Sequence, residues 1–275
     1  MIYVTKANGT KESFDKNKII NTCLKLKLNY QQAQEVVKKI EKKVYDGIST
    51  KKILKMIFRY AKLYRPSIGY QVDLKESISL LRPKPDFEKF IGIVFSVLGY
   101  KTETNLILKG ACVEHEIDVV AKKNEETIIV EVKHHVNPHK YTGLDVFLEV
   151  NSTLEDLKEG FKIGNHPYNF SKALVICNTK ISEHAKKYSL CKKIEAIAWK
   201  YPENFGLEKI IEENKIYPIT FLKEISSFEL QKLGDCGIVT IKQLLDDARK
   251  ISSKTKISLK RIEELQEKSR IILKS

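Results

Sequence analysis

Two short apolar segments near the middle of the chain carry charged residues, and they constrain the fold more than any other feature. Residues 116–121 read Glu-Ile-Asp-Val-Val-Ala, and residues 127–133 read Thr-Ile-Ile-Val-Glu-Val-Lys. Short runs rich in β-branched residues are typical of strands. Because strand side chains alternate between faces, we expect Glu131 and Lys133 to share one face while the alternate valines point into the core. Asp118 is expected to end the first strand, which a short hairpin would place beside the second.

This arrangement of charges suits phosphodiester hydrolysis. Mg²⁺, or Mn²⁺ in its place, takes carboxylate and carbonyl oxygens at about 2.0–2.1 Å and keeps several waters. We expect Asp118, Glu131 and Val132 to hold the metal, which acidifies a bound water and stabilises the negative charge that develops. Lys133 would orient that water and favour its deprotonated form. The alternative is a structural Glu131–Lys133 pair on a solvated strand face, worth only about 0–1 kcal/mol.

The apolar periodicity divides the chain into three parts, and the fold class it predicts is multidomain α/β. Residues 1–82 show a hairpin signal at Asn8-Gly9, followed by a bundle of helical patterns at 18–26, 31–44, 50–63 and 68–81. Asp15 could cap the first helix, and Ser49 or Thr50 the third. The segment Arg82-Pro83-Lys84-Pro85-Asp86 reads as a stiff connector that ends the preceding helix.

Residues 83–221 alternate between strands and helices. Strands are expected at 106–108, 116–121, 127–133, 172–177 and 194–199, and helices at 87–98, 144–158 and 182–190. Such alternation predicts an α/β sandwich with a mixed sheet. Residues 222–275 are expected to be helical, with a helix through Leu245 and a final one at 259–273 that Ser258 would cap.

The composition limits the kinds of molecule that the chain is expected to bind. Forty-nine Lys and Arg against 35 Asp and Glu give a formal net charge of +14, which attracts polyanions such as nucleic acid. A lysine-rich proteome is the alternative explanation. The five scattered cysteines form no CxxC pair, so neither a zinc ribbon nor a disulfide framework is indicated. No run is long and apolar enough for a membrane span or a signal peptide, so we expect a cytoplasmic protein.

Residues 83–221 carry a family resemblance. Phe87-Glu88-Lys89-Phe90 with Leu98-Gly99-Tyr100 matches an opening helix, while Ile117-Asp118-Val119 and Glu131-Val132-Lys133 match a D…ExK core. The segment resembles an Mrr-like restriction endonuclease domain of the PD-(D/E)XK superfamily. The resemblance implies that Asp118 and Glu131 are metal ligands, that Lys133 is catalytic, and that Glu88 assists from the helix. For Glu88 the alternative is an exposed helix residue. His134 and His135 are interpreted as surface residues leaving the strand rather than as phosphate contacts.

Residues 1–82 resemble an ATP-cone, a nucleotide-sensing domain. The matching residues are Val4, Lys6, Gly9, Glu12, Phe14, Asp15, Lys18 and Ile19. The resemblance implies ATP or dATP as an effector, and we expect Lys6, Gly9, Lys11 and Lys18 to surround its phosphates. The segment Ala7-Asn8-Gly9-Thr10-Lys11 departs from the family's longer basic turn. Without a GxxxxGK[ST] motif, the site is expected to sense nucleotide and not to hydrolyse it. A small helical domain with ordinary surface lysines is the alternative.

Residues 222–275 resemble a helix-hairpin-helix domain through Leu233-Gly234-Asp235-Cys236-Gly237-Ile238. Backbone amides at such a glycine turn contact DNA phosphates without reading bases. Asp235 or Cys236 stands where the family usually has proline. The basic residues that follow are Lys254, Lys256, Lys260, Arg261, Lys268, Arg270 and Lys274, set against Glu263, Glu264 and Glu267. The alternative is a helical protein-interaction tail.

Together these features predict a metal-dependent DNA endonuclease tuned by ATP or dATP. A homodimer is plausible because two DNA strands need two active sites. The alternative from another class is a non-catalytic, nucleotide-responsive DNA-binding regulator, since a nuclease fold can lose its activity. Cleavage of RNA or of branched DNA stays open, as do the target sequence and any dependence on methylation.

Overall fold

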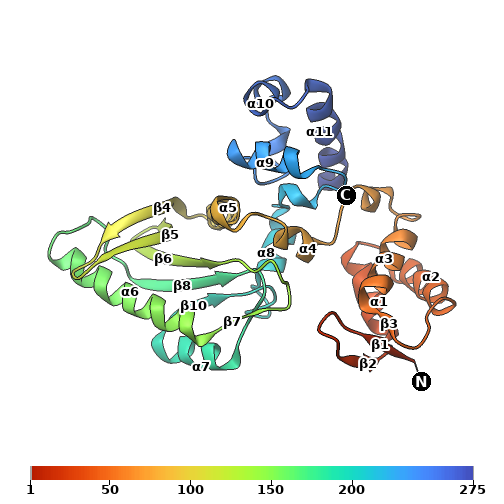
Figure 1. The fold of residues 1–275 in the computed structure, drawn as a ribbon, viewed down its shortest axis with the longest axis horizontal. Helices are drawn as coiled ribbons and strands as arrows, with labels where there is room; N and C mark the ends of the chain where they lie inside the picture. The colour runs from red at the N-terminus through yellow and green to blue at the C-terminus, as the bar shows by residue number, and fades with distance from the viewer. Residues whose placement is uncertain (1, 275) are drawn as a thin grey trace. The chain divides into compact units, whose positions relative to one another are not determined.

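The computed structural model describes residues 2–274 and confirms a multidomain α/β chain (Figure 1). It divides into two compact units. The first holds residues up to 72, residues 222–224 and those from 267 onward, and the second holds 73–221 and 225–266. Within residues 2–274, no helix combines the length and the apolar character needed to cross a membrane.

A small sheet opens the first unit. Strands β1 (Tyr3–Thr5) and β2 (Lys11–Ser13) pair antiparallel, which confirms the predicted hairpin. Gly9 has φ +82°, a conformation that glycine adopts without steric cost, and its N–H donates to the Lys6 carbonyl. Strand β3 (Ile48–Ser49) pairs parallel with β1 and was not predicted, because two residues are too short to show a period.

Three helices cover this sheet: α1 (Lys16–Lys25), α2 (Tyr30–Glu41) and α3 (Thr50–Ala61). Asp15 caps α1 by accepting from the Asn17 N–H, and Ser49 caps α3 by accepting from the Lys52 N–H. Both caps were predicted. The apolar stripe of α2 is buried as its spacing indicated.

The helix predicted over residues 68–81 is wrong. The chain instead forms a 3₁₀ turn, η1 (Pro66–Tyr70), passes through extended backbone at Gln71, and then forms α4 (Leu74–Ser79). Asp73 accepts a 3.0 Å hydrogen bond from the Glu76 N–H. This cap starts a new helix where the apolar periodicity alone indicated a continuous one.

The second unit is built on a five-stranded mixed sheet in the order β10-β8-β6-β5-β4. Its strands are β4 (Lys101–Lys109), β5 (Glu114–Lys123), β6 (Glu126–Lys133), β8 (Lys172–Cys177) and β10 (Glu195–Ile197). Strands β4, β5 and β6 are antiparallel, whereas β6, β8 and β10 are parallel. This confirms the mixed sheet. Two-residue strands β7 (Tyr141–Thr142) and β9 (Lys180–Ile181) add a separate parallel pair.

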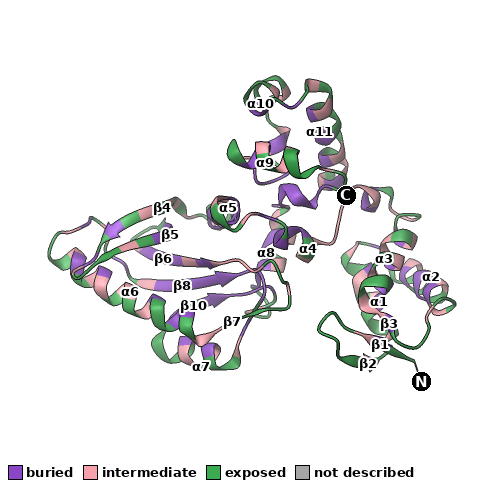
Figure 2. Cartoon of the chain, viewed as in Figure 1, coloured by how far each residue is buried: buried purple, intermediate pink, exposed green. Residues whose placement is uncertain are grey.

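Helices cover the sheet as a sandwich. Helix α5 (Glu88–Val97) lies on one side, and α6 (Leu144–Lys162) with α7 (Glu183–Lys192) lies on the other (Figure 1). The central strands are almost entirely buried (Figure 2), which explains why they read as continuous apolar runs. A charged residue inside such a strand therefore needs a specific partner.

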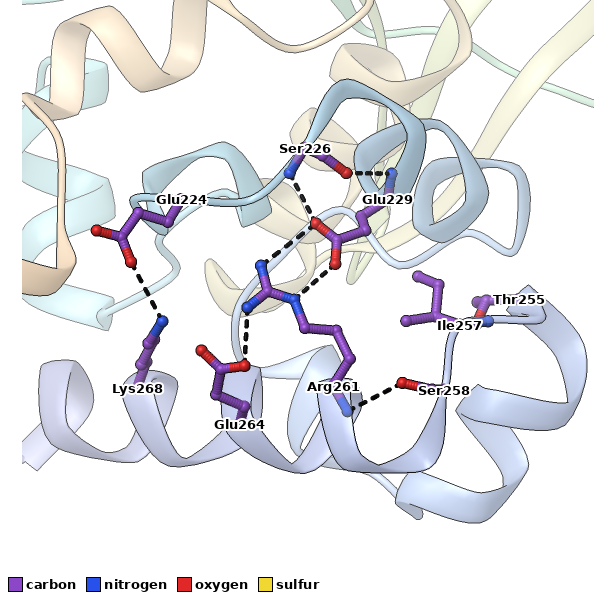
Figure 3. Close-up of polar contacts among 9 residues, drawn as sticks. All are labelled: Glu224, Ser226, Glu229, Thr255, Ile257, Ser258, Arg261, Glu264 and Lys268. Carbon is purple, nitrogen blue, oxygen red and sulfur yellow. Dashed lines mark hydrogen bonds and ion pairs between the residues drawn. The ribbon is translucent and has the colours of Figure 1, made fainter.

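The chain closes with α8 (Leu207–Asn214), η3 (Ile219–Phe221), α9 (Ser227–Asp235), η4 (Gln243–Leu245), α10 (Ala248–Thr255) and α11 (Leu259–Lys274). The helix predicted after Ile238 and through Leu245 is wrong, because the chain forms only the 3₁₀ turn η4 there. Ser226 and Glu229 form a capping box on α9, and Arg261 of α11 donates to Glu229 at 2.6 Å (Figure 3).

Candidate active site

Asp118 sits inside β5 rather than at its end, so its predicted place in the strand is wrong. The strand continues to Lys123, and its register pairs Val119 with Val130 of β6. Two residues beyond Val130, the Val132 N–H donates a 2.8 Å hydrogen bond to Oδ2 of Asp118. The Asp118 residue is only 6% exposed. A buried carboxylate held by a backbone amide of the neighbouring strand has a fixed position.

Glu131 and Lys133 project together from β6, as the alternation predicted. The Lys133 Nζ lies 2.6 Å from Oε1 of Glu131, and the two side chains are only 32% and 23% exposed. Burial and the charge of Asp118 raise the pKa of Glu131. Burial is the largest single influence on Lys133 and lowers its pKa. The hydrogen bond to Glu131 and the charges of Glu131, Glu149 and Asp118 together outweigh burial, so the net pKa of Lys133 is raised. The Glu131–Lys133 pair is therefore partly buried and close enough to Asp118 to respond to its charge. It differs in this from the exposed, solvated pair that was the alternative interpretation.

Glu88 opens α5 and is 2% exposed, so the alternative of an exposed helix residue is wrong. Its Oε2 atom is buried and has no hydrogen-bond partner. Burial raises the pKa of Glu88 first, and the neighbouring charge of Asp118 raises it further. Glu88 and Asp118 thus form a buried pair of like charges, a state that a bound cation would relieve.

Lys84 also lies at this site, although the sequence pattern predicted that it belongs to a stiff connector. Its Nζ lies 2.7 Å from Glu116, 3.2 Å from Glu88 and 3.5 Å from Asp118. The segment η2 (Pro83–Phe87) leads directly into α5, and Lys84 itself has extended backbone there, with φ −121° and ψ 137°. The four-residue spacing of Lys84 and Glu88 was the available signal. Glu149 of α6 was also missed, and its charge contributes to the raised pKa of Glu131.

The two histidines after Lys133 are not the surface residues that were expected. His134 is half-buried, its Nε2 contacts the Ile78 carbonyl at 3.0 Å, and its ring lies edge-on to Phe87. His135 contacts Thr142 through Nε2 at 3.0 Å. Burial lowers the pKa of both rings. Both rings therefore contact neighbouring residues of the protein near the end of β6.

The donor chemistry at the site fits a hard divalent cation. Among residues 2–274, no three His, Cys, Asp or Glu side chains are arranged to hold a metal ion by themselves. Asp118 and Glu131 would therefore need further oxygen ligands. The Val132 side chain has no ligating atom, so its backbone carbonyl is the group available, and Mg²⁺ and Mn²⁺ complete their shells with water. The unpartnered Glu88 oxygen adds negative charge beside this set.

The predicted nucleotide-binding residues lie around the β1–β2 turn. Lys6 and Lys18 converge on Glu12, with Nζ–Oε distances of 2.6 and 2.8 Å, and together they lower the pKa of Glu12. Gly9 forms the turn and Lys11 is exposed on β2. The structure therefore brings Lys6 and Lys18 to one point next to the glycine turn.

The backbone amides of the glycine turn after α9 form hydrogen bonds within the protein. The N–H groups of Cys236, Gly237 and Ile238 donate to carbonyls of α9, which satisfies the end of that helix. A Cβ on Gly234 would lie 2.6 Å from the Arg82 guanidinium and 2.7 Å from Asp86. The amides expected to bind phosphate are thus occupied, and Gly234 is required for close packing.

Exposed lysines remain on the C-terminal helices. Lys254, Lys256 and Lys260 are exposed, whereas Arg261 pairs with Glu229 and Glu264. Lys268 also pairs, with Glu224 at 3.5 Å (Figure 3). The positive surface available to a polyanion is therefore smaller than the sequence indicated.

Three family models match successive parts of the chain. The family described as ATP cone domain matches residues 2–73, Restriction endonuclease matches 82–200, and AF1548-like, C-terminal matches 217–273. A protein of Archaeoglobus fulgidus described as uncharacterized is 34% identical over 167 residues, which cover 61% of this chain and 90% of the relative.

A solved structure titled "Crystal Structure of Protein of Unknown Function AF1548" has a TM-score of 0.59 and 32% identity, covering 68% of this chain and 97% of that chain. The ATP-cone and nuclease resemblances are thus confirmed, while the helix-hairpin-helix resemblance stays a prediction. With so much of each relative covered, the chain belongs to the AF1548-like family and joins its restriction-endonuclease and C-terminal domains to an ATP-cone.

Proposed function

We propose that this protein is a divalent-metal-dependent DNA endonuclease whose activity responds to ATP or dATP. Asp118, Glu131 and the Val132 carbonyl would hold Mg²⁺ or Mn²⁺, Lys133 would act on the attacking water, and Glu88 would add charge from α5. The domains would divide the chain near residues 82 and 221. The observation that carries the proposal is the hydrogen bond from the Val132 N–H to Asp118 beside the Glu131–Lys133 pair.

The metal would supply an acidified water and stabilise charge on the phosphate. The chain's own residues supply positioning. The Val132 N–H holds one oxygen of Asp118, and Lys133 holds one oxygen of Glu131, so neither carboxylate is free to turn away. The raised pKa of Lys133 keeps its ammonium protonated at neutral pH. Lys133 is therefore suited to attract hydroxide and to stabilise negative charge, and is not suited to accept a proton.

Two features support DNA and nucleotide as partners. The net charge of +14 favours a polyanion, and Lys254, Lys256 and Lys260 are exposed on the C-terminal helices. In the ATP-cone, Lys6 and Lys18 share a single carboxylate partner, so incoming phosphates would replace Glu12. The predicted helix-hairpin-helix segment would add a DNA contact through its side chains, because the amides of its turn bond to carbonyls of α9.

Cleavage of supercoiled plasmid with Mg²⁺ or Mn²⁺ tests the proposal, with ATP or dATP present and absent. The wild type is compared with Asp118→Asn and Lys133→Met, and Glu125→Gln and Lys122→Met serve as exposed charge-matched controls. We expect the site variants to lose cleavage and the controls to keep it. Equal cleavage by all five proteins would contradict the assigned site.

The same assay separates the other readings. Nucleotide-dependent DNA binding without cleavage under any metal condition would favour the non-catalytic regulator. RNA and branched DNA are included as substrates, because preferential cleavage of either would change the substrate class while leaving the site assignment intact.

A further inference from the structure

The Lys84 ammonium occupies a position where a metal-dependent enzyme would be expected to bind its metal ion. The ammonium lies within 3.5 Å of carboxylate oxygens from Glu88, Glu116 and Asp118, which come from α5 and β5. It contacts Oδ1 of Asp118, whereas the Val132 N–H holds Oδ2. The carboxylate oxygen of Asp118 that the backbone leaves free is thus the one that the lysine approaches.

The surrounding charges explain why a cation is held there. Glu88 is almost completely buried, and its second oxygen lacks a hydrogen-bond partner. Leaving such carboxylates without a counter-charge is costly, because a buried charge needs pairing. Lys84 partly neutralises the group, yet its single charge faces three carboxylates.

The Lys84 side chain can move out of this acidic cluster more easily than the carboxylate side chains can. The Lys84 side chain is 58% exposed, whereas the side chains of Asp118 and Glu88 are 8% and 2% exposed. Its long, flexible stem lets the ammonium move into water without disturbing the core. Glu116 is also largely exposed and can follow it.

We propose that Lys84 is an internal counter-cation that occupies the acidic cluster of Glu88, Glu116 and Asp118 and is displaced when a divalent cation binds. This inference rests on the proposed metal site and adds a competition to it. Lys84 partly neutralises the cluster in the metal-free protein and raises the metal concentration needed to load the site. A doubly charged ion replaces a singly charged one, so the exchange favours the metal once its concentration is sufficient.

Calorimetric titration of the full chain with Mn²⁺, without nucleic acid, tests the competition. We expect Lys84→Met to lower the Kd for Mn²⁺ by about tenfold or more, because a unit charge within 4 Å of the site has been removed. Lys84→Arg, which keeps the charge, and Lys122→Met, a matched exposed lysine on β5, should stay near the wild-type Kd. An unchanged or raised Kd for Lys84→Met would overturn the inference.

Asp118→Asn separates this inference from the proposed function. If Asp118→Asn abolishes Mn²⁺ binding while Lys84→Met leaves it unchanged, only the competition is wrong. If Asp118→Asn binds Mn²⁺ as the wild type does, the metal site itself is wrong.

A second measurement uses the wild-type protein, so it does not depend on how a variant folds. Lysine acetylation followed by mass spectrometry reports whether the Lys84 ammonium is held. We expect saturating Mn²⁺ to raise the acetylation rate of Lys84 several-fold, about the gain that follows from losing its three carboxylate partners, and to leave Lys122 unchanged. A Lys84 rate that does not rise with Mn²⁺ would overturn the proposal.

Discussion

The backbone N–H of Val132 donates a 2.8 Å hydrogen bond to the Asp118 carboxylate, across the two strands that carry the candidate site. The N–H and C=O of one residue in an extended strand leave on the same side. The Val132 carbonyl therefore points toward β5, the strand that carries Asp118. A single strand residue thus fixes one proposed metal ligand and offers another.

Lys133 can be separated from the metal ligands by experiment. We predict that Lys133→Met lowers single-turnover cleavage by about 100-fold or more, because it removes a positive charge aimed at the reacting group. Mn²⁺ binding should be retained, since Asp118, Glu131 and the Val132 carbonyl remain. Cleavage rates and calorimetric Kd values measured on the same preparations check this. Loss of Mn²⁺ binding alongside cleavage would instead make Lys133 a support for Glu131.

The raised pKa of Glu131 predicts how stability depends on pH. Folding favours the protonated form of this carboxyl, so its contribution to stability is complete below the pKa of the unfolded chain. That contribution is lost as the pH rises through the higher pKa of the folded protein. In EDTA at neutral pH, Glu131→Gln should therefore raise the Tm, because glutamine mimics the uncharged carboxyl that folding favours. Thermal unfolding of both proteins across pH measures the difference, which should vanish in acid.

A lower Tm for Glu131→Gln at neutral pH would show that the Lys133 ion pair outweighs the burial of the charge. Glu125→Gln, at the exposed β5–β6 turn, is the matched control and should leave the Tm within about 1 °C of the wild type.

Much of the central domain could be predicted because burial leaves a periodic signal. Strand β8 was placed at its full length by its apolar run, and the shared face of Glu131 and Lys133 followed from strand alternation. Strand β4 was predicted as only three residues, since it alternates with Lys, Thr, Glu and Asn, and its full extent depends on pairing with β5.

The errors arose where distant partners decide the structure. The break before α4 depends on the Asp73 cap, which competes with a periodicity that continues across it. Lys84 looked like part of a linker because prolines flank it, and its role depends on carboxylates more than 30 residues away in sequence. Glu88 could be placed on its helix, but its near-complete burial follows only from packing.

The ATP-cone can be tested through Lys6. We predict that Lys6→Ala weakens ATP binding by about tenfold, the scale of one charge-assisted contact to phosphate. Lys38→Ala, an exposed lysine of α2, is the matched control. Fluorescent-nucleotide titration measures both. Equal affinity in Lys6→Ala and the wild type would place the nucleotide away from the β1–β2 turn.

Gly234 is predicted to be a packing residue. Gly234→Ala would bring a methyl group within 3 Å of Arg82 and Asp86, and we expect it to lower the free energy of unfolding by about 1–3 kcal/mol. Gly69→Ala, where an added Cβ meets nothing within 4 Å, is the control. Denaturant unfolding measures both changes. If Gly234→Ala were neutral for stability but weakened DNA binding, the glycine would belong to a DNA contact instead.

The most direct test of a metal held between β5 and β6 is a crystal structure of the protein soaked with Mn²⁺, with data collected for anomalous scattering. The account predicts one anomalous peak about 2.0–2.3 Å from oxygens of Asp118, Glu131 and the Val132 carbonyl, with the Lys84 ammonium moved away from it. A saturated crystal with no peak at these oxygens, or with Mn²⁺ bound only elsewhere, would contradict it.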